Sequence, residues 1–160
     1  MRALPGDLPG RGGLGRTSGA GHDSVKSMSD PASITPTSSP VCVLACSGCS
    51  AAGELADHTA RRLQQLGAAK MSCLAGVGGR IPSITATVRG ASGILMIDGC
   101  PLECGAHVLR NAGFTNFKQL KLHELNVRKN DSGAVDETTV RRLADAALRL
   151  LDQNPNIVPV

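Results

Sequence analysis

From residue 41 onward, apolar and polar positions follow two alternating patterns. Short unbroken apolar runs, such as VCVLA (41–45) and GILMID (93–98), are typical of strands buried on both faces of a sheet. Between them lie segments with apolar residues every three or four positions, as in amphipathic helices. This alternation predicts a parallel sheet with helices on both sides. We therefore expect an α/β fold, with a small, mostly parallel sheet in a flavodoxin-like or Rossmann-like three-layer sandwich.

Local signals predict where several elements begin and end. Ser50 is a suitable N-cap for a helix that ends at Gly67, and Asp136 is a suitable N-cap for the last helix. Pro101 suits the first position of a helix, and Gly113 suits the residue just past its end. The remaining expected elements are strands at 69–75 and 117–122 and a short helix at 81–89.

The first forty residues differ in composition from the rest. Residues 1–40 contain seven of the 19 glycines and five of the nine prolines and show no apolar period. Such a segment buries too little apolar surface to offset the entropy of ordering it. We expect a disordered tail at 1–40, one domain at 41–153 and a short tail at 154–160. The tail lacks the pattern of a secretory signal, so we expect a cytoplasmic protein, with Met28 as an alternative natural start.

Composition also limits the partners. The chain has a net charge of +4, no Trp or Tyr and two Phe, which leaves little aromatic surface to stack on bases. No apolar run approaches the length needed to cross a bilayer. We expect neither a nucleic acid nor a membrane as a partner.

All six cysteines lie in the predicted domain, and four of them form two pairs. CSGC (Cys46, Cys49) follows the first strand, and DGCPLEC (Cys100, Cys104) follows the strand at 93–98. If these strands are neighbours, as in flavodoxin-like order, both loops open into one crevice at the carboxyl edge of the sheet. Each loop also leads to a helix N-terminus, which lowers the pKa of a thiol. Four converging thiolates suit zinc or an iron–sulfur cluster.

Other residues carry weaker signals. Cys42, inside the first strand, is expected in the core, and Cys73, at the end of the second strand, is a further candidate for the crevice. Asp98 is expected to cap the turn that follows it, and His107 is expected to face solvent. GVGGR (76–80) lacks the Lys-Ser/Thr of a phosphate-binding loop and the third glycine of a dinucleotide fingerprint. No catalytic or cofactor-binding residue is assigned.

Three motifs together resemble the DGC-domain family, which is named after its central tripeptide. CSGCS, KMSCLAGVGG and IDGCPLEC occur here in that order, and the resemblance covers most of residues 41–130. ELNVRKN is similar to a family segment that usually has Gly where Asn126 stands. The resemblance implies a zinc-binding protein with chelating cysteines at Cys46, Cys49, Cys100 and Cys104, and with Cys73 as a further candidate.

Three functions are open at this level. The first is zinc binding, in a structural or metal-handling role, with the metal ion as partner. The second is a thiol-disulfide or persulfide redox enzyme that uses CSGC. The third is an iron–sulfur electron carrier with the same ligands, because thiolates suit both metals.

Overall fold

The computed structural model describes residues 39–48, 50–130 and 135–152 of the chain. The predicted tails at 1–40 and 154–160 lie outside these residues, apart from residues 39 and 40. Cys49, the second thiol of CSGC, lies outside them too.

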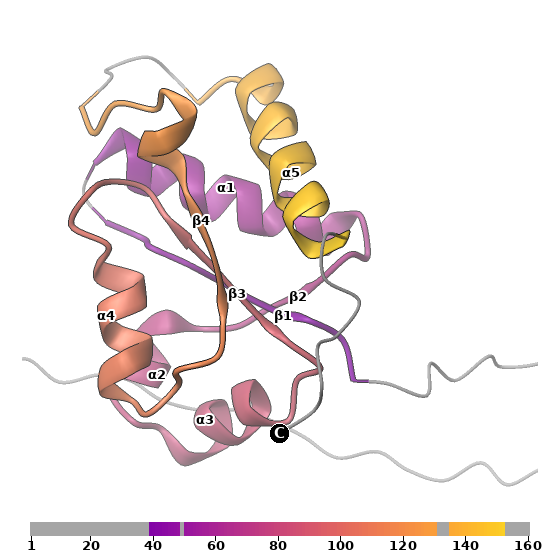
Figure 1. The fold of residues 1–160 in the computed structure, drawn as a ribbon, viewed down its shortest axis with the longest axis vertical. Coiled ribbons are helices and arrows are strands. Elements are labelled where there is room, and N and C mark those ends of the chain that lie inside the picture. The colour runs from indigo at the N-terminus through magenta and orange to yellow at the C-terminus, as the bar shows by residue number, and fades with distance from the viewer. Residues whose placement is uncertain (1–38, 49, 131–134, 153–160) are drawn as a thin grey trace, which may run out of the picture. The chain divides into compact units, whose positions relative to one another are not determined.

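The described elements alternate as the sequence predicts (Figure 1). None of the helices in residues 39–48, 50–130 and 135–152 is long and apolar enough to cross a membrane. In chain order the elements are β1 (Cys42–Ala45), α1 (Ala51–Gln65), β2 (Lys70–Met71), α2 (Leu74–Gly78), α3 (Pro82–Arg89), β3 (Ile94–Asp98), α4 (Cys104–Asn111), β4 (Lys118–Lys121), the 3-10 helix η1 (Leu122–Leu125) and α5 (Glu137–Asp152).

The four strands form one parallel sheet in the order β2-β1-β3-β4. Helices α1 and α5 cover one face, and α2, α3 and α4 lie on the other (Figure 1). β1 and β3 are direct neighbours, with Ala45 opposite Ile97. The predicted α/β three-layer fold and the adjacency of the first and third strands are confirmed.

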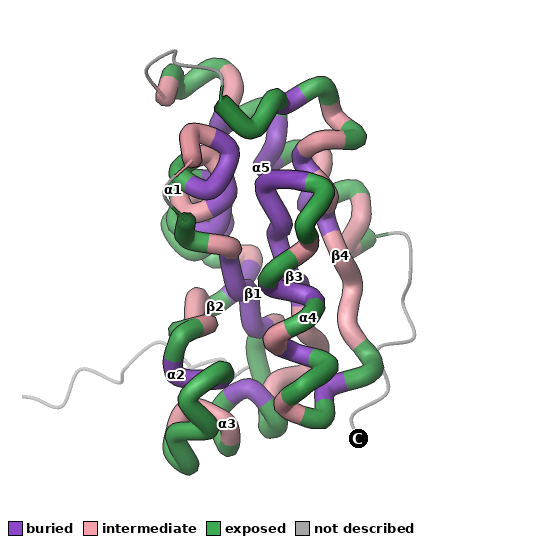
Figure 2. The backbone as a smooth tube through the Cα atoms, turned by 90° about the vertical axis from the view of Figure 1, so that its left-hand side faces the viewer, coloured by how far each residue is buried: buried purple, intermediate pink, exposed green. Residues whose placement is uncertain are grey.

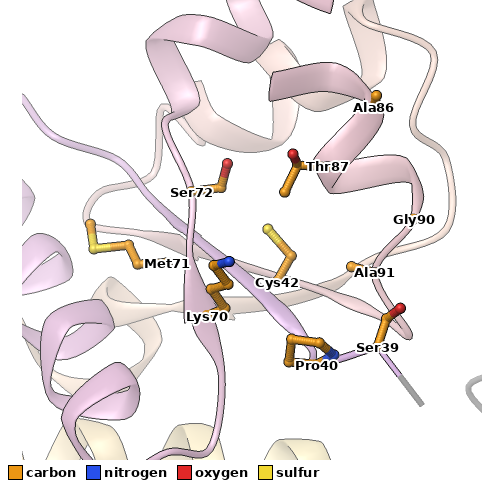
Figure 3. A pocket seen from close by; sticks show the side chains of 10 residues that line it. All are labelled: Ser39, Pro40, Cys42, Lys70, Met71, Ser72, Ala86, Thr87, Gly90 and Ala91. Atoms are coloured by element: carbon orange, nitrogen blue, oxygen red, sulfur yellow. The ribbon is translucent and has the colours of Figure 1, made fainter. Parts of the chain in front are cut away.

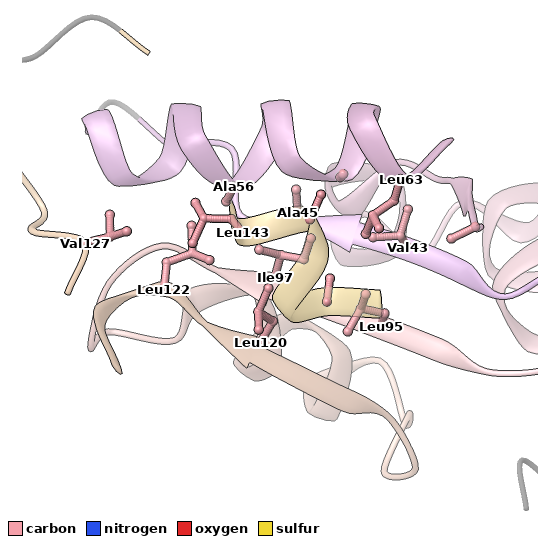
Figure 4. Close-up of a cluster of buried hydrophobic side chains, with 14 of the residues drawn as sticks. Val43, Ala45, Ala56, Leu63, Leu95, Ile97, Leu120, Leu122, Val127 and Leu143 are labelled. Atoms are coloured by element: carbon pink, nitrogen blue, oxygen red, sulfur yellow. The ribbon is translucent and has the colours of Figure 1, made fainter. Parts of the chain in front are cut away.

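The core has two halves because the central strands are buried on both faces (Figure 2). Val43 and Ile97 belong to the half that packs against α1 and α5, which Figure 4 shows. Leu44 and Met96, one position along each strand, belong to the half that packs against α2, α3 and α4. Side chains of the unbroken apolar runs therefore pack on both faces of the sheet.

Most of the predicted helix bounds are confirmed. The Ser50 side chain accepts a backbone N–H of the first turn of α1 at 3.2 Å. Asp136 does the same for α5 at 2.8 Å. Gly67 and Gly113 follow α1 and α4 with φ of 71° and 87°, a left-handed conformation that glycine adopts without strain. The predicted helix at 81–89 is α3, which begins at Pro82.

Two predicted bounds are wrong. The strand expected at 69–75 is only Lys70–Met71, because Cys73 starts a helix: its Sγ accepts the Gly76 N–H at 3.3 Å, and the glycine-rich segment that follows forms α2. Pro101 does not open a helix. Instead α4 begins at Cys104, after a turn that places Glu103 in the left-handed region with φ of 48°.

Cys42 lies in the core, as predicted, with a side chain that is 4% exposed. It lines a pocket of about 250 Å³ between β1, β2 and α3, and its thiol points toward Ser72 and Thr87 (Figure 3). Burial raises the pKa of Cys42 from 9.0 to about 11, although the Ser72 side chain and the Lys70 ammonium lower it in part.

This pKa predicts a loss of stability at alkaline pH. Above about pH 9 the unfolded chain ionises this thiol while the folded protein keeps it protonated, so the free energy of unfolding falls by up to about 1.4 kcal/mol per pH unit until about pH 11. Cys42→Val lacks this contribution. In urea unfolding, the stability of the variant relative to the natural protein should therefore rise from pH 8 to pH 10, whereas parallel curves would contradict the assignment.

Candidate metal centre

The pairing of β1 with β3 brings the two thiol loops to one edge of the sheet. Cys46 follows the last paired residue of β1, and its backbone N–H donates to the Ile97 carbonyl at 2.8 Å. Asp98 ends β3, and Cys100 lies two residues further on. Both loops therefore begin at neighbouring positions, where β1 and β3 turn away toward α1 and α4 (Figure 1).

Glycines let the two loops approach at backbone distance. A Cβ added at Gly99 would lie 2.5 Å from the Ala52 carbonyl oxygen, in the first turn of α1. A Cβ at Gly53 would lie 2.7 Å from the Gly48 nitrogen, in the CSGC loop. The turn after β3 thus rests on the start of α1, and the CSGC loop folds back on the same helix turn.

The ionisation of Cys46 reflects both loops. Burial raises the pKa of Cys46 above 9.0, and a hydrogen bond from the Gly99 backbone lowers it in part. The negative charges of Asp98, Cys104 and Cys100 each raise it further. Groups of the other loop therefore contribute to the raised pKa of Cys46. The expectation that a helix N-terminus lowers the pKa of this thiol is wrong, because burial and like charge outweigh it.

Asp98 caps α4 and not, as predicted, the turn that directly follows it. Its carboxylate is fully buried and accepts the Gly105 N–H at 2.8 Å and the Ala106 N–H at 3.1 Å. These are free donors of the first helix turn, where a carboxylate is favoured. Because Asp98 occupies them, they are not available to the neighbouring thiols.

Cys100 and Cys104 lie in different surroundings, whereas a helix beginning at Pro101 would have placed them one turn apart on the same side. Cys100 sits in the turn before α4 and is 7% exposed. Cys104 is the first residue of α4 and is exposed. The difference arises because the helix starts three residues later than the proline suggests.

Cys73 lies at the end of β2, across β1 from β3. It is exposed and lines a groove of about 750 Å³ that also touches Ala45 and Ser47 next to the CSGC loop. It is not among the groups that shift the pKa of Cys46. His107 is exposed on α4, as predicted.

Strand pairing therefore brings the loops that carry Cys46, Cys100 and Cys104 to one edge of the sheet. Within residues 39–48, 50–130 and 135–152, no three His, Cys, Asp or Glu side chains are grouped so that they could hold a metal ion by themselves. The predicted ligand set also includes Cys49, which lies outside the described residues. Thiols are soft donors, and a set of them fits a thiophilic cation in its chemistry.

Contacts made by the later part of the chain were not predicted. The Lys129 carbonyl accepts the Ala52 N–H at 3.4 Å, so the loop after η1 reaches the start of α1. Asn126 in that loop has φ of 63°. Asn tolerates this left-handed conformation better than most residues, so Asn in place of the family's usual Gly keeps the turn.

A side chain of β4 also reaches the site: the Gln119 Nε2 donates a hydrogen bond to the Asp98 carboxylate at 2.9 Å. No motif or spacing marks Gln119, since its role depends on the register of β4.

The contact between Gly99 and Ala52 can be tested directly. Gly99→Ala forces a methyl group against the backbone of α1, so we expect the free energy of unfolding to fall by about 1–3 kcal/mol in urea titrations. Gly48→Ala is the matched control in the facing loop, since nothing lies within 4 Å of the added Cβ. Equal stability of the two variants would contradict the close approach.

Comparisons with protein families and with single proteins both found a match. The DGC domain family matches residues 42–147, which span the sheet and most of α5. The chain is similar to the "Anaerobic and virulence modulator AnvM" of Pseudomonas aeruginosa, with 38% identity over 109 residues that cover 68% of this chain and 83% of that protein. No solved structure matches. The chain therefore belongs to the DGC domain family.

Proposed function

We propose that this DGC domain binds one zinc ion between the loops that follow β1 and β3. The observation that carries the proposal is the shared position of the two loops: β1 pairs with β3 up to Ala45 and Ile97, and Gly99 rests on the start of α1. The proposed ligands are Cys46, Cys49, Cys100 and Cys104.

The charges around Cys46 support the binding of a cation. Thiols used as free nucleophiles have a lowered pKa and a positively charged neighbour. Cys46 has the opposite surroundings, since burial, Asp98 and two further thiols all oppose its ionisation. A bound dication would supply the missing positive charge and deprotonate the thiols. This favours metal binding over thiol-disulfide or persulfide exchange.

The location of the cluster supports a metal-handling role more than a structural one. The fold has a hydrophobic core on each face of the sheet, so it does not depend on a metal as a small zinc finger does. Cys104 is exposed, which leaves a bound ion within reach of a partner. Four thiolates leave no open position for catalysis. A role in modulation also agrees with the name of the Pseudomonas relative, a virulence modulator.

An iron–sulfur cluster on the same cysteines is the second candidate, because thiolates bind both metals and the relative's name refers to anaerobic conditions. Anaerobic purification separates the two: a colourless protein with zinc and no iron supports the first proposal, and a coloured protein with iron and sulfide supports the second.

The zinc proposal predicts about one zinc per chain after purification without added metal, measured by elemental analysis. Cys46→Ser and Cys100→Ser should each weaken zinc affinity by more than about 100-fold, because even the loss of an outer-shell partner costs 10–100-fold. A zinc content near zero that does not rise on titration would rule the proposal out.

Two cysteine variants serve as matched controls. Cys42→Val removes a core thiol, and Cys73→Ser removes an exposed thiol at the neighbouring strand end. Both should keep the zinc. Loss of zinc in Cys73→Ser would instead place Cys73 among the ligands.

A further inference from the structure

Side chains of β4 form hydrogen bonds and an ion pair with the segment between β3 and α4. The Gln119 Nε2 donates to Asp98 Oδ2 at 2.9 Å and to Glu103 Oε2 at 3.1 Å. The Lys121 ammonium pairs with Glu103 Oε1 at 2.7 Å. A single amide group thus holds both ends of the segment that carries Cys100.

The register of the sheet produces this arrangement. Met96 pairs with Gln119, and Asp98 pairs with Lys121, so these side chains share the face that α4 covers. Asp98 and Gln119 are diagonal neighbours, which long side chains can bridge. Among the described residues, Gln119 is the one side chain that donates a hydrogen bond to the buried Asp98 carboxylate. Its loss would leave that carboxylate short of a donor, which is costly in a buried site.

The conformation of Glu103 also depends on these contacts. Its φ of 48° is uncommon for a residue other than glycine, and its side chain does not cap α4 although it stands at the N-cap position. The side chain is held by Gln119 and Lys121 instead, and Asp98 provides the cap. The contacts to β4 add to the backbone hydrogen bond from the Glu103 N–H to the Cys100 carbonyl at 3.1 Å, and together they keep the turn in this sparsely populated conformation.

We propose that Gln119 is a positioning residue: it holds the turn at 99–103 in place and so keeps Cys100 buried beside Cys46. This positioning of the turn does not depend on zinc. Its consequence for zinc affinity rests on the proposed function.

The geometric part is tested by thiol reactivity in the metal-free, folded protein. Gln119→Met removes both hydrogen bonds without adding charge. Alkylation of Cys100 by iodoacetamide, followed by peptide mass spectrometry, should become about tenfold faster through local opening of the turn. Cys42 is the internal reference: a general loss of stability would accelerate both cysteines, whereas loss of positioning accelerates Cys100 alone.

Lys118→Met is the matched control on the same strand. The Lys118 ammonium donates to the carbonyls of Leu150 and Leu151 at 2.8 and 2.9 Å, on α5 at the opposite face. This variant should leave the Cys100 rate unchanged relative to Cys42. The inference is overturned if Gln119→Met changes the Cys100 rate by less than about twofold, or accelerates Cys42 equally.

Zinc affinity is the second readout. Gln119→Met should bind zinc about tenfold more weakly, the usual effect of losing an outer-shell partner, whereas Lys118→Met should bind as the natural protein does. Unchanged affinity in Gln119→Met would overturn the consequence for zinc affinity while leaving zinc binding itself intact. If the natural protein binds no zinc, the proposed function fails, and the alkylation rates alone decide whether Gln119 positions the turn.

Discussion

The parallel pairing of β1 with β3 is the constraint on which the candidate site depends. It sets Ala45 opposite Ile97 and continues through the hydrogen bond from Cys46 to Ile97, so the two loops leave the sheet side by side. The chain then departs on opposite faces, toward α1 and toward α4, which is where open parallel sheets bind ligands. Two loops that are far apart in sequence, one after Ala45 and one after Asp98, therefore begin side by side.

Close backbone contacts and nearby charges further define the site that the pairing of β1 with β3 sets up. Gly99 lets the turn after β3 pack against the start of α1. The buried Asp98 carboxylate accepts hydrogen bonds from the first turn of α4, so it is not free to act as a base. Cys46 is half-buried, Cys100 is buried and Cys104 is exposed, and burial and nearby negative charge raise the pKa of Cys46. Such surroundings suit a bound cation better than a reactive free thiolate.

Signals that act over a few residues predicted much of this structure. The apolar runs located β1 and β3, the caps at Ser50 and Asp136 located two helices, and the rule for strand ends placed both cysteine loops at one edge. The start of α4 was missed because its cap, Asp98, stands six residues earlier and the proline between them occupies a turn. The role of Gln119 could not be predicted, since it follows from the register between β3 and β4.

The central claim is that both loops share one ion. X-ray absorption at the zinc edge of the purified protein tests it most directly, because the scattering shell reports the donor atoms themselves. Coordination by both cysteine pairs predicts four sulfur atoms at about 2.3 Å from zinc. A shell made mainly of nitrogen and oxygen, or one with only two sulfur atoms, would contradict it.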